Sequence, residues 1–172
     1  MLREAAVLIP VYRRQDGELM VVLVRRAHGG AHGGQLALPG GQRDPSDADL
    51  AATALREANE ELGLASDQLE LLAALPVVAT QTTGFQIAPF LARLAGPAPW
   101  RLQEREIAEV VEVPVAALAR PEVRAEAVRG FPTWPAPRRV QLWRVGSHEV
   151  WGVTYRILEP LVPRLLGGEW PL

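Results

Sequence analysis

Three glutamates stand close together in one short segment of the chain, and their spacing limits what that segment can be. Residues 56–64 read REANEELGL, which places Glu57, Glu60 and Glu61 at positions i, i+3 and i+4. Side chains with this spacing are neighbours on one helix surface, and like charges four residues apart cost a helix roughly 0.2–0.5 kcal/mol. A cation bound between the carboxylates would remove that cost. The simpler interpretation of any Glu-rich helix is a solvated acidic face.

The flanks of this segment favour a binding site over a plain acidic face. A glycine-rich loop, Pro39-Gly40-Gly41, precedes the helix, and Gly63 ends it. The helix is predicted from about Asp49 to Leu62, on an apolar stripe of Leu50, Ala51, Ala54, Leu55, Ala58 and Leu62. Its candidate N-caps are Ser46, Asp47 and Asp49. Because Glu57 and Glu61 fall at the edge of the stripe, we expect them where the helix meets the rest of the domain.

Composition indicates one enzyme-sized domain and excludes several other classes. A chain of 172 residues with 48% apolar residues is expected to form a single domain over residues 1–172. The net charge of −2 gives no general attraction for nucleic acid, and the absence of cysteine excludes disulfides and thiolate metal sites. Charge enters at once in Met1-Leu2-Arg3-Glu4, unlike a signal peptide, and no apolar run reaches membrane-spanning length. We therefore expect a cytoplasmic protein, with a homodimer left open.

The order of elements predicts a mixed α/β fold. Strands are expected at 5–11, 19–24, 36–38, 69–78, 85–94 and 107–113, with a hairpin turn at 15–18 and a second hairpin of 140–145 and 149–150 around Gly146-Ser147. A helical turn is expected at 115–119, a weak helical pattern at 120–127, and a final helix from about Trp151 to Leu166. The stretches 27–35 and 130–137 are predicted to be loops.

The glutamate segment resembles the Nudix box of the Nudix hydrolases. The family pattern is a glycine, five residues, a glutamate, seven residues, and then Arg-Glu-aliphatic-x-Glu-Glu-x-Gly-aliphatic. Its second half matches from Arg56 to Leu64, with Ala58 in the first aliphatic place. The resemblance implies an α/β Nudix-type α/β/α sandwich with a mixed central sheet, held between the helices at 49–62 and 151–166.

The first half of the box departs from the family pattern. Five residues separate Gly41 from Asp47, which stands in place of the glutamate, and eight residues then separate Asp47 from Arg56. The intervening loop therefore carries an insertion or a reshaped turn. Asp44 and Asp47 are both candidate partners of Arg56.

The resemblance implies the hydrolysis of a pyrophosphate with Mg²⁺ or Mn²⁺ as cofactor. Hard cations prefer carboxylate and carbonyl oxygens, and they neutralise phosphate charge and lower the pKa of bound water. The implied metal ligands are Glu57, Glu60 and Glu61 with the carbonyl of Gly40, and the three glutamates with Arg56 are the implied catalytic residues. Arg56 is expected to orient the site rather than bind phosphate. The resemblance also implies a further acid outside the box, for which Glu104, Glu106 and Glu109 are considered and Glu106 is favoured by its place just before Ile107. For each of them a solvated loop charge is at least as good an interpretation. None of His28, His32 and His148 is assigned a catalytic role.

Three stretches outside the box resemble the coenzyme A pyrophosphatase branch, namely 34–41 (GQLALPGG), 83–89 (TGFQIAP) and 150–154 (VWGVT). This resemblance implies a small-molecule nucleotide substrate, coenzyme A or a derivative, cut to 3′,5′-ADP and 4′-phosphopantetheine. Its 3′-phosphate needs a basic contact, for which Arg25, Arg26 and Arg43 are the candidates. The branch signature is incomplete, because Leu38 replaces a phenylalanine and Gly30 stands where an arginine is expected.

Two alternatives stay open at this level. One is a Nudix hydrolase acting on another nucleotide, such as ADP-ribose or a nucleoside triphosphate. The other is a non-catalytic nucleotide-binding module on the same fold, against which the retained repulsive glutamates argue.

Overall fold

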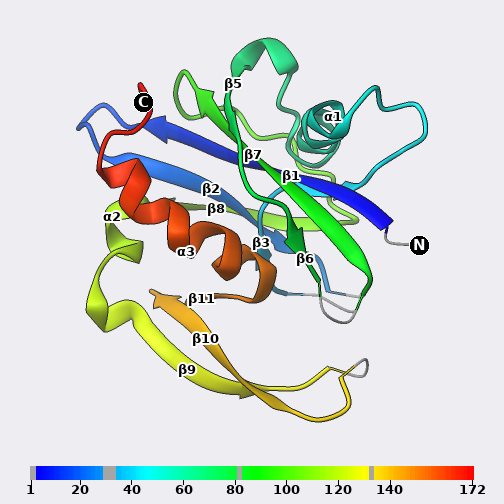
Figure 1. The fold of residues 1–172 in the computed structure, drawn as a ribbon. Coiled ribbons are helices and arrows are strands. Elements are labelled where there is room, and N and C mark those ends of the chain that lie inside the picture. Colours follow the sequence, from blue (N-terminus) through cyan, green and yellow to red (C-terminus); the bar gives the residue numbers. More distant parts are fainter. Residues whose placement is uncertain (1–2, 29–33, 81–82, 132–133) are drawn as a thin grey trace.

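A long mixed sheet forms the centre of the molecule in the computed structural model, which describes residues 3–28, 34–80, 83–131 and 134–172 (Figure 1). Its strands are β1 (Arg3–Arg13), β2 (Leu19–Arg26), β3 (Leu36–Ala37), β4 (Gly40–Gln42), β5 (Leu69–Ala74), β6 (Val78–Ala79), β7 (Phe85–Leu94) and β8 (Ile107–Pro114). The main path runs β3-β2-β1-β7-β5, with β4 also paired to β1, β6 to β7 and β8 to β2. Strands β1 and β7 run parallel, whereas the other pairs are antiparallel.

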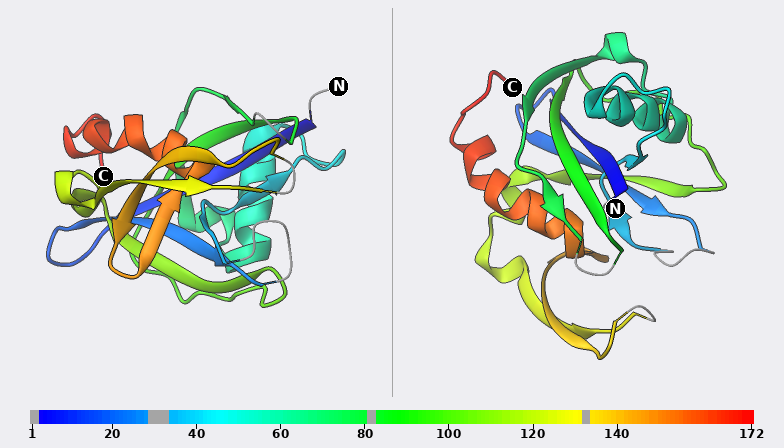
Figure 2. Two further views of the ribbon diagram at one scale, coloured as in Figure 1. Left: turned by 90° about the horizontal axis from the view of Figure 1, so that it is seen from below. Right: turned by 45° about the vertical axis from the view of Figure 1, so that its right-hand side comes forward.

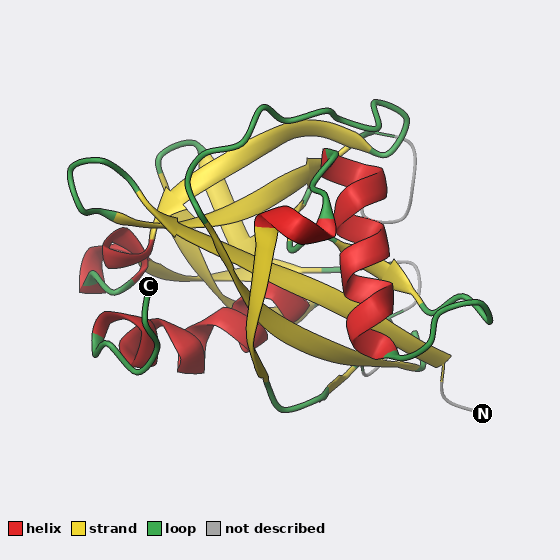
Figure 3. Ribbon diagram, turned by 90° about the horizontal axis from the view of Figure 1, so that it is seen from above, coloured by secondary structure: helices red, strands yellow, loops and turns green. Residues whose placement is uncertain are grey.

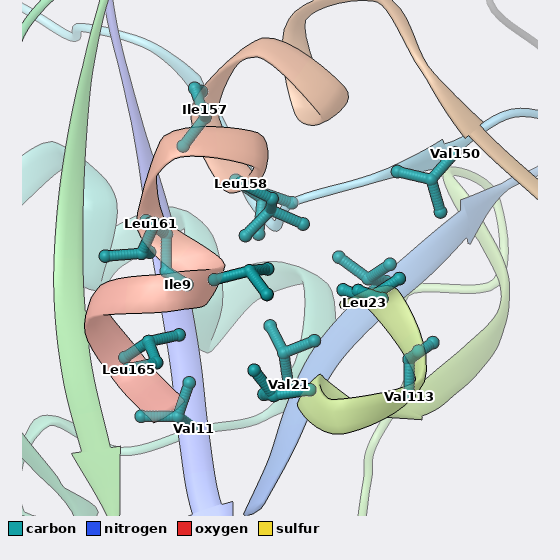
Figure 4. Close-up of a cluster of buried hydrophobic side chains, with 14 of the residues drawn as sticks. Ile9, Val11, Val21, Leu23, Val113, Val150, Ile157, Leu158, Leu161 and Leu165 are labelled. Atoms are coloured by element: carbon teal, nitrogen blue, oxygen red, sulfur yellow. The ribbon is translucent and has the colours of Figure 1, made fainter. Parts of the chain in front are cut away.

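Two helices cover opposite faces of this sheet, α1 (Leu50–Leu62) on one side and α3 (Gly152–Leu166) on the other (Figures 1 and 3). The alternation of side chains along β2 explains the two layers, because successive residues of a strand point to opposite faces. Leu19, Val21 and Leu23 join the core beneath α3, and Met20, Val22 and Val24 join the core beneath α1. Figure 4 shows the α3 side, where Ile157, Leu158, Leu161 and Leu165 meet Ile9, Val11, Val21 and Leu23. The predicted mixed α/β fold with a helix on each face is confirmed.

A separate three-stranded antiparallel sheet lies beyond α3 and is built from β9 (Arg124–Arg129), β10 (Arg138–Val145) and β11 (His148–Trp151). It follows the short helix α2 (Val115–Leu118) and a 3₁₀ turn, η2 (Pro121–Val123). Strand β11 lies against β3, so the small sheet adjoins the edge of the main one. In Figures 1 and 2 strands β9 and β10 extend toward the same side of the molecule as the start of β1.

Most predicted elements are confirmed, and three differ. The helical pattern at 120–127 is wrong, because residues 124–129 pair with β10 as strand β9 and only 121–123 turn as a 3₁₀ helix. Pairing with a neighbouring strand overrides a weak local preference. The strand expected at 69–78 is two strands, β5 and β6, and the 3₁₀ turn η1 (Ser66–Gln68) precedes it. The segment expected as a glycine-rich loop is partly extended, since Gly40–Gln42 is strand β4.

The described residues contain no helix long and apolar enough to cross a membrane.

Candidate active site

Helix α1 is fixed at both ends by local interactions, and these set where its glutamates lie. The Asp49 side chain accepts a hydrogen bond from the Ala52 N–H at 2.8 Å and caps the first turn. Gly63 ends the helix in the left-handed conformation, at φ 72°, and its N–H donates to the last carbonyls. Ala54, Ala58 and Leu62 lie on the buried face of α1 and belong to the hydrophobic core between this helix and the sheet. Asp49 is therefore the N-cap among the three candidates.

Glu61 is the most deeply buried of the three glutamates. It is only 2% exposed, and its Oε2 accepts a hydrogen bond from the Gly40 N–H at 3.0 Å. Burial raises the pKa of this carboxyl from 4.5 to about 7, and the charges of Glu57 and Glu106 also raise it, whereas the Gly40 N–H and the charge of Arg26 lower it. Without a bound cation, an ionised Glu61 is thus a buried negative charge that the Gly40 N–H and Arg26 compensate only in part.

Gly40 owes its place beside Glu61 to the pairing of β4 with β1. Gly40 lies opposite Val7 in the register of the two strands. The next pair, Leu8 and Pro39, is a hydrogen-bonded pair, because the Leu8 N–H donates to the Pro39 carbonyl. Hydrogen-bonded and non-bonded pairs alternate in an antiparallel ladder, so the N–H and C=O of Gly40 both point away from β1. The N–H reaches Glu61, and the carbonyl faces the same side.

The two glycines leave no room for side chains, and each for a different reason. A Cβ on Gly40, at φ +155°, would stand 2.3 Å from the Ala6 carbonyl oxygen and 2.6 Å from Val7 Cα. A Cβ on Gly41 would stand 2.6 Å from the Glu57 carboxylate. Gly40 therefore permits the close approach of two strands, and Gly41 permits the approach of Glu57.

Glu57 and Glu60 differ in burial although both contact Arg56. The Glu57 side chain is 13% exposed and that of Glu60 is 55% exposed. Arg56 Nη1 donates to Glu57 Oε1 at 2.9 Å and to Glu60 Oε2 at 3.1 Å. Burial raises the pKa of the Glu57 carboxyl, against the opposing contacts of Arg56. The prediction that Glu57 and Glu61 lie at the buried edge of the helix is confirmed.

Asp47 is the main partner of Arg56, which resolves the choice between Asp44 and Asp47. Arg56 Nε and Nη2 donate to the two carboxylate oxygens of Asp47 at 2.9 and 3.0 Å, a bidentate pair. These bonds hold the pKa of the Asp47 carboxyl far below its usual range. Asp44 turns away and accepts hydrogen bonds from Ser46. The reshaped loop thus supplies an aspartate where the family pattern has a glutamate, and Arg56 further donates to the Gln42 carbonyl at 3.1 Å.

The three arginines considered for substrate lie in different places. Arg26 follows Val22 and Val24 on the α1 face of the sheet, where its charge acts on Glu61. Within the described parts of the chain Arg26 has no hydrogen-bonded or ion-paired side-chain partner. Arg25 is bound by Glu109, at 2.6 Å, and by His148. Arg43 pairs with Glu4 at 2.9 Å. The structure brings only Arg26 of the three beside the buried glutamates.

The other acids and histidines stay at the margin. Glu106 is exposed, yet its charge raises the pKa of both Glu57 and Glu61, so it lies near them. Glu109 is occupied by Arg25. His28 lies beside Gly34, and His32 and Gly30 are outside the described residues.

The oxygen atoms of Glu57, Glu60, Glu61 and the Gly40 carbonyl suit a hard cation, provided that Glu57 and Glu60 release their hydrogen bonds with Arg56. Over the described ranges, no three acidic or histidine side chains converge closely enough to hold a metal ion as they stand. Glu57 and Glu60 are drawn toward Arg56, and Glu61 toward the Gly40 N–H. Burial, and to a smaller extent neighbouring acids, nevertheless raises the pKa values of Glu57 and Glu61, so both are carboxylates whose ionised form a divalent cation would stabilise. All the donors are oxygens, which Mg²⁺ and Mn²⁺ prefer.

Comparisons with known proteins agree with this geometry. The sequence profile of the NUDIX domain matches residues 1–134. The chain is 40% identical over 162 residues to a protein of Salmonella paratyphi B named as an uncharacterized Nudix hydrolase, NudL, covering 92% of this chain and 81% of that protein. The crystal structure of the Nudix hydrolase RenU from M. smegmatis superposes with a TM-score of 0.67 at 25% identity, over 99% of this chain and 88% of that one. An Ap4A hydrolase of C. elegans shares the fold, with a TM-score of 0.57 at 21% identity, over 68% and 83% of the two chains.

Proposed function

The chain belongs to the Nudix family, and we propose that it hydrolyses coenzyme A or a derivative at the pyrophosphate, in a reaction that needs Mg²⁺ or Mn²⁺. The family itself supports the general activity, the hydrolysis of a nucleotide-linked pyrophosphate. The observation that carries the proposal is the pair of crowded carboxylates, Glu57 and Glu61, packed against Gly40 and Gly41. A solvated acidic face would not bury them.

The proposed metal ligands are Glu57, Glu60, Glu61 and the carbonyl of Gly40. When bound, the cation neutralises phosphate charge and lowers the pKa of a coordinated water, which makes that water a better nucleophile near neutral pH. Glu61 is held in place by the Gly40 N–H, and burial excludes water around it. Glu60, the most exposed of the set, is expected to contribute least.

Arg56 is proposed to act through position. Its guanidinium joins the Gln42 carbonyl, Asp47 and two glutamates, and so it ties the loop before α1 to the ligands on the helix. Five contacts from one planar group need the forked geometry of arginine, which lysine lacks. Asp47 fixes the guanidinium in turn.

The substrate proposal gains support from where the three coenzyme A-like stretches lie. Ala6 stands opposite Gly41 on one side of β1 and opposite Ala88 on the other, so the stretches 34–41 and 83–89 flank one strand. The third stretch, 150–154, covers the end of β11, which lies against β3. Segments far apart in sequence therefore gather at one edge of the molecule, as parts of one binding site would.

The test is a panel of nucleotides. We expect metal-dependent cleavage of coenzyme A to 3′,5′-ADP and 4′-phosphopantetheine, with a higher kcat/KM than for dephospho-coenzyme A, which lacks only the 3′-phosphate. Faster cleavage of ADP-ribose or a nucleoside triphosphate would favour another Nudix hydrolase. No metal-dependent phosphate or nucleotide release from any compound would favour a non-catalytic binding module.

The same panel tests the basic contact. A charge-assisted contact to the 3′-phosphate is worth about 1.5–3 kcal/mol, or about 10- to 100-fold in kcat/KM. Arg26→Ala is expected to remove the preference for coenzyme A over dephospho-coenzyme A, more than Arg25→Ala or Arg43→Ala does, because those two are already paired. The exposed Arg105, changed to alanine, is the control and should keep the preference. An unchanged preference in Arg26→Ala would exclude this residue as the contact.

A further inference from the structure

Thr53 is a fully buried polar residue in the first half of helix α1, with an exposed fraction of 0%. Its Oγ1 lies 2.8 Å from Asp47 Oδ2 and 3.3 Å from the Asp49 carbonyl oxygen. A hydroxyl has one hydrogen to donate, and the Asp49 carbonyl already accepts a hydrogen bond from the Thr53 N–H at 3.1 Å. Because the shorter contact with a charged acceptor is the stronger one, the hydroxyl donates to Asp47.

The Asp47 carboxylate is surrounded by donors. Its Oδ2 accepts hydrogen bonds from Thr53 Oγ1, from the Asp44 N–H at 2.9 Å and from Arg56 Nη2 at 3.0 Å, and its Oδ1 accepts from Arg56 Nε at 2.9 Å. Arg56 makes the largest contribution to the lowered pKa of Asp47, the Asp44 N–H follows, and Thr53 adds a smaller one. Since Asp47 is only 8% exposed, water replaces a lost donor poorly.

These donors come from two parts of the chain. The Asp44 N–H belongs to the same loop as Asp47, whose own N–H donates back to the Asp44 carbonyl at 3.0 Å, so this contact fixes the carboxylate within the loop. Thr53 and Arg56 both belong to α1 and are neighbours on its surface, three residues apart. Thr53 is short and β-branched, with few rotamers available in a helix. It therefore ties the loop carboxylate to the helix independently of the long Arg56 side chain.

The direction of the Asp47 carboxylate matters because of what Arg56 contacts next. The guanidinium is planar, so its two hydrogen bonds with Asp47 also set the direction of Nη1. Nη1 donates to Glu57 and Glu60, both proposed metal ligands. A carboxylate that turned at Asp47 would therefore change how Arg56 meets these glutamates.

The hydroxyl also fits the departure of this chain from the family pattern. Asp47 stands where the pattern has a glutamate, and its side chain is shorter by one methylene group. To reach Arg56 with a shorter acid, the loop backbone must come closer to α1, and this brings the carboxylate within hydrogen-bonding distance of Thr53.

We propose that Thr53 is a positioning residue of the proposed reaction, whose hydroxyl fixes the Asp47 carboxylate and thereby the Arg56 guanidinium. The inference rests on the proposed function, because it takes the glutamates that Arg56 contacts as metal ligands. Thr53 itself contacts neither those glutamates nor the Gly40 backbone, so it acts only through Asp47.

The test compares Thr53→Val, which keeps the branched shape and removes the hydroxyl, with Thr53→Ser, which keeps the hydroxyl. Thr53→Val should lower the kcat for the cleaved nucleotide by about 10-fold, the lower end of the range for residues that orient metal ligands, and should change KM by less than about 2-fold. Thr53→Ser should restore most of the rate. If Thr53→Val does not fold, Thr53→Ala replaces it, because alanine has the highest helix propensity.

A second measurement needs no substrate. In the metal-free protein the hydrogen exchange of the Arg56 Nε–H, followed by NMR, should be at least about 2-fold faster in Thr53→Val than in the wild type, the lower end of couplings within one hydrogen-bond network. Thr53→Ser should exchange as the wild type does. The matched control is Ser46→Ala, which removes a hydroxyl of the same loop that donates to Asp44, and it should keep the wild-type kcat and exchange rate.

A double variant separates positioning from a purely structural role. Adding Thr53→Val to Asp47→Asn should lower kcat little further, because both changes disturb the same contact. A full additional 10-fold loss in the double variant, or a wild-type kcat and Arg56 exchange rate in folded Thr53→Val, would overturn the proposal while leaving the proposed function intact. If the protein cleaves no nucleotide, faster Arg56 exchange in Thr53→Val that Thr53→Ser reverses would support the positioning and remove the proposed function.

Discussion

Glu61→Gln tests two effects of the Glu61 charge, namely the stability that is lost by burying it and its proposed role in hydrolysis. Glutamine keeps the size of the side chain and an acceptor for the Gly40 N–H, and it removes the charge. In the metal-free protein the folded-state pKa of Glu61, about 7, lies above its ordinary value of 4.5. The folded state therefore holds this proton more tightly than the unfolded state. The contribution of Glu61 to the free energy of unfolding is fully present below pH 4.5 and is lost as the pH rises through 7.

The size of this effect follows from the same two values. Their difference corresponds to about 3 kcal/mol of lost stability in the metal-free wild type at pH 8, as an upper figure. We expect Glu61→Gln to match the wild type near pH 4 and to exceed it in free energy of unfolding at pH 8 in EDTA. Urea unfolding at a series of pH values measures the free energy of unfolding of each protein. Subtracting the wild-type values from those of Glu61→Gln removes the contributions of the other titrating groups.

The control is Glu60→Gln, one position away and 55% exposed, which makes the same change of charge. It should keep the pH dependence of the wild type. Added Mg²⁺ should stabilise the wild type and not Glu61→Gln, since a ligand that binds only the folded state stabilises it by mass action. The kcat of Glu61→Gln should fall by about 10²-fold or more. A stability difference between wild type and Glu61→Gln that does not grow from pH 5 to pH 8 would refute the buried, uncompensated carboxylate.

Three further predictions concern the loop and the metal. Gly41→Ala should fold with nearly wild-type melting temperature yet lose about 10- to 100-fold in kcat, because its Cβ displaces only the carboxylate of Glu57, a proposed metal ligand. Gly40→Ala meets backbone instead and should lower stability by about 1–3 kcal/mol, so equal losses of stability in the two variants would contradict this. Asp47→Asn and Arg56→Lys should each reduce kcat by about 10- to 100-fold through lost positioning, and a full rate in Arg56→Lys would show that charge alone suffices. Excess EDTA should abolish hydrolysis and Mg²⁺ or Mn²⁺ should restore it, so full activity in EDTA would disprove the metal requirement.

Local patterns were enough to predict the helix and the burial of its acids. The stripe through Ala54, Ala58 and Leu62 places Glu57 and Glu61 at its edge whatever the helix packs against. The alternation of residues along β2 similarly predicts that the adjacent Arg25 and Arg26 lie on opposite faces of the sheet. Continuing the alternation of its buried residues puts Arg26 on the α1 face and Arg25 on the other, so the sequence itself contains this signal.

Other features depend on contacts between distant segments and had no local signal. Residues 124–129 become strand β9 because β10 offers a partner, and a Glu, Ala and Arg pattern alone does not distinguish strand from helix there. The choice of Asp47 over Asp44 depends on the loop turn, in which the Asp44 N–H donates to the Asp47 carboxylate and Thr53 Oγ1 adds a second bond. Spacing narrowed the partner of Arg56 to two residues, and only the folded loop selects one.

The position of Gly40 beside Glu61 depends both on a local sequence pattern and on the pairing of distant segments. Helix periodicity alone aims Glu61 at the sheet, but the group that it meets is set by the register of β4 on β1. With Gly40 opposite Val7, its N–H and carbonyl point away from β1, and the N–H donates to Glu61. A slip of one residue in this pairing would turn both groups into the ladder and present Gly41 instead, because bonded and non-bonded positions alternate. A Cβ on Gly40 would stand 2.3 Å from the Ala6 carbonyl oxygen, so only glycine permits this register, and the register sets the direction of the Gly40 N–H that reaches Glu61.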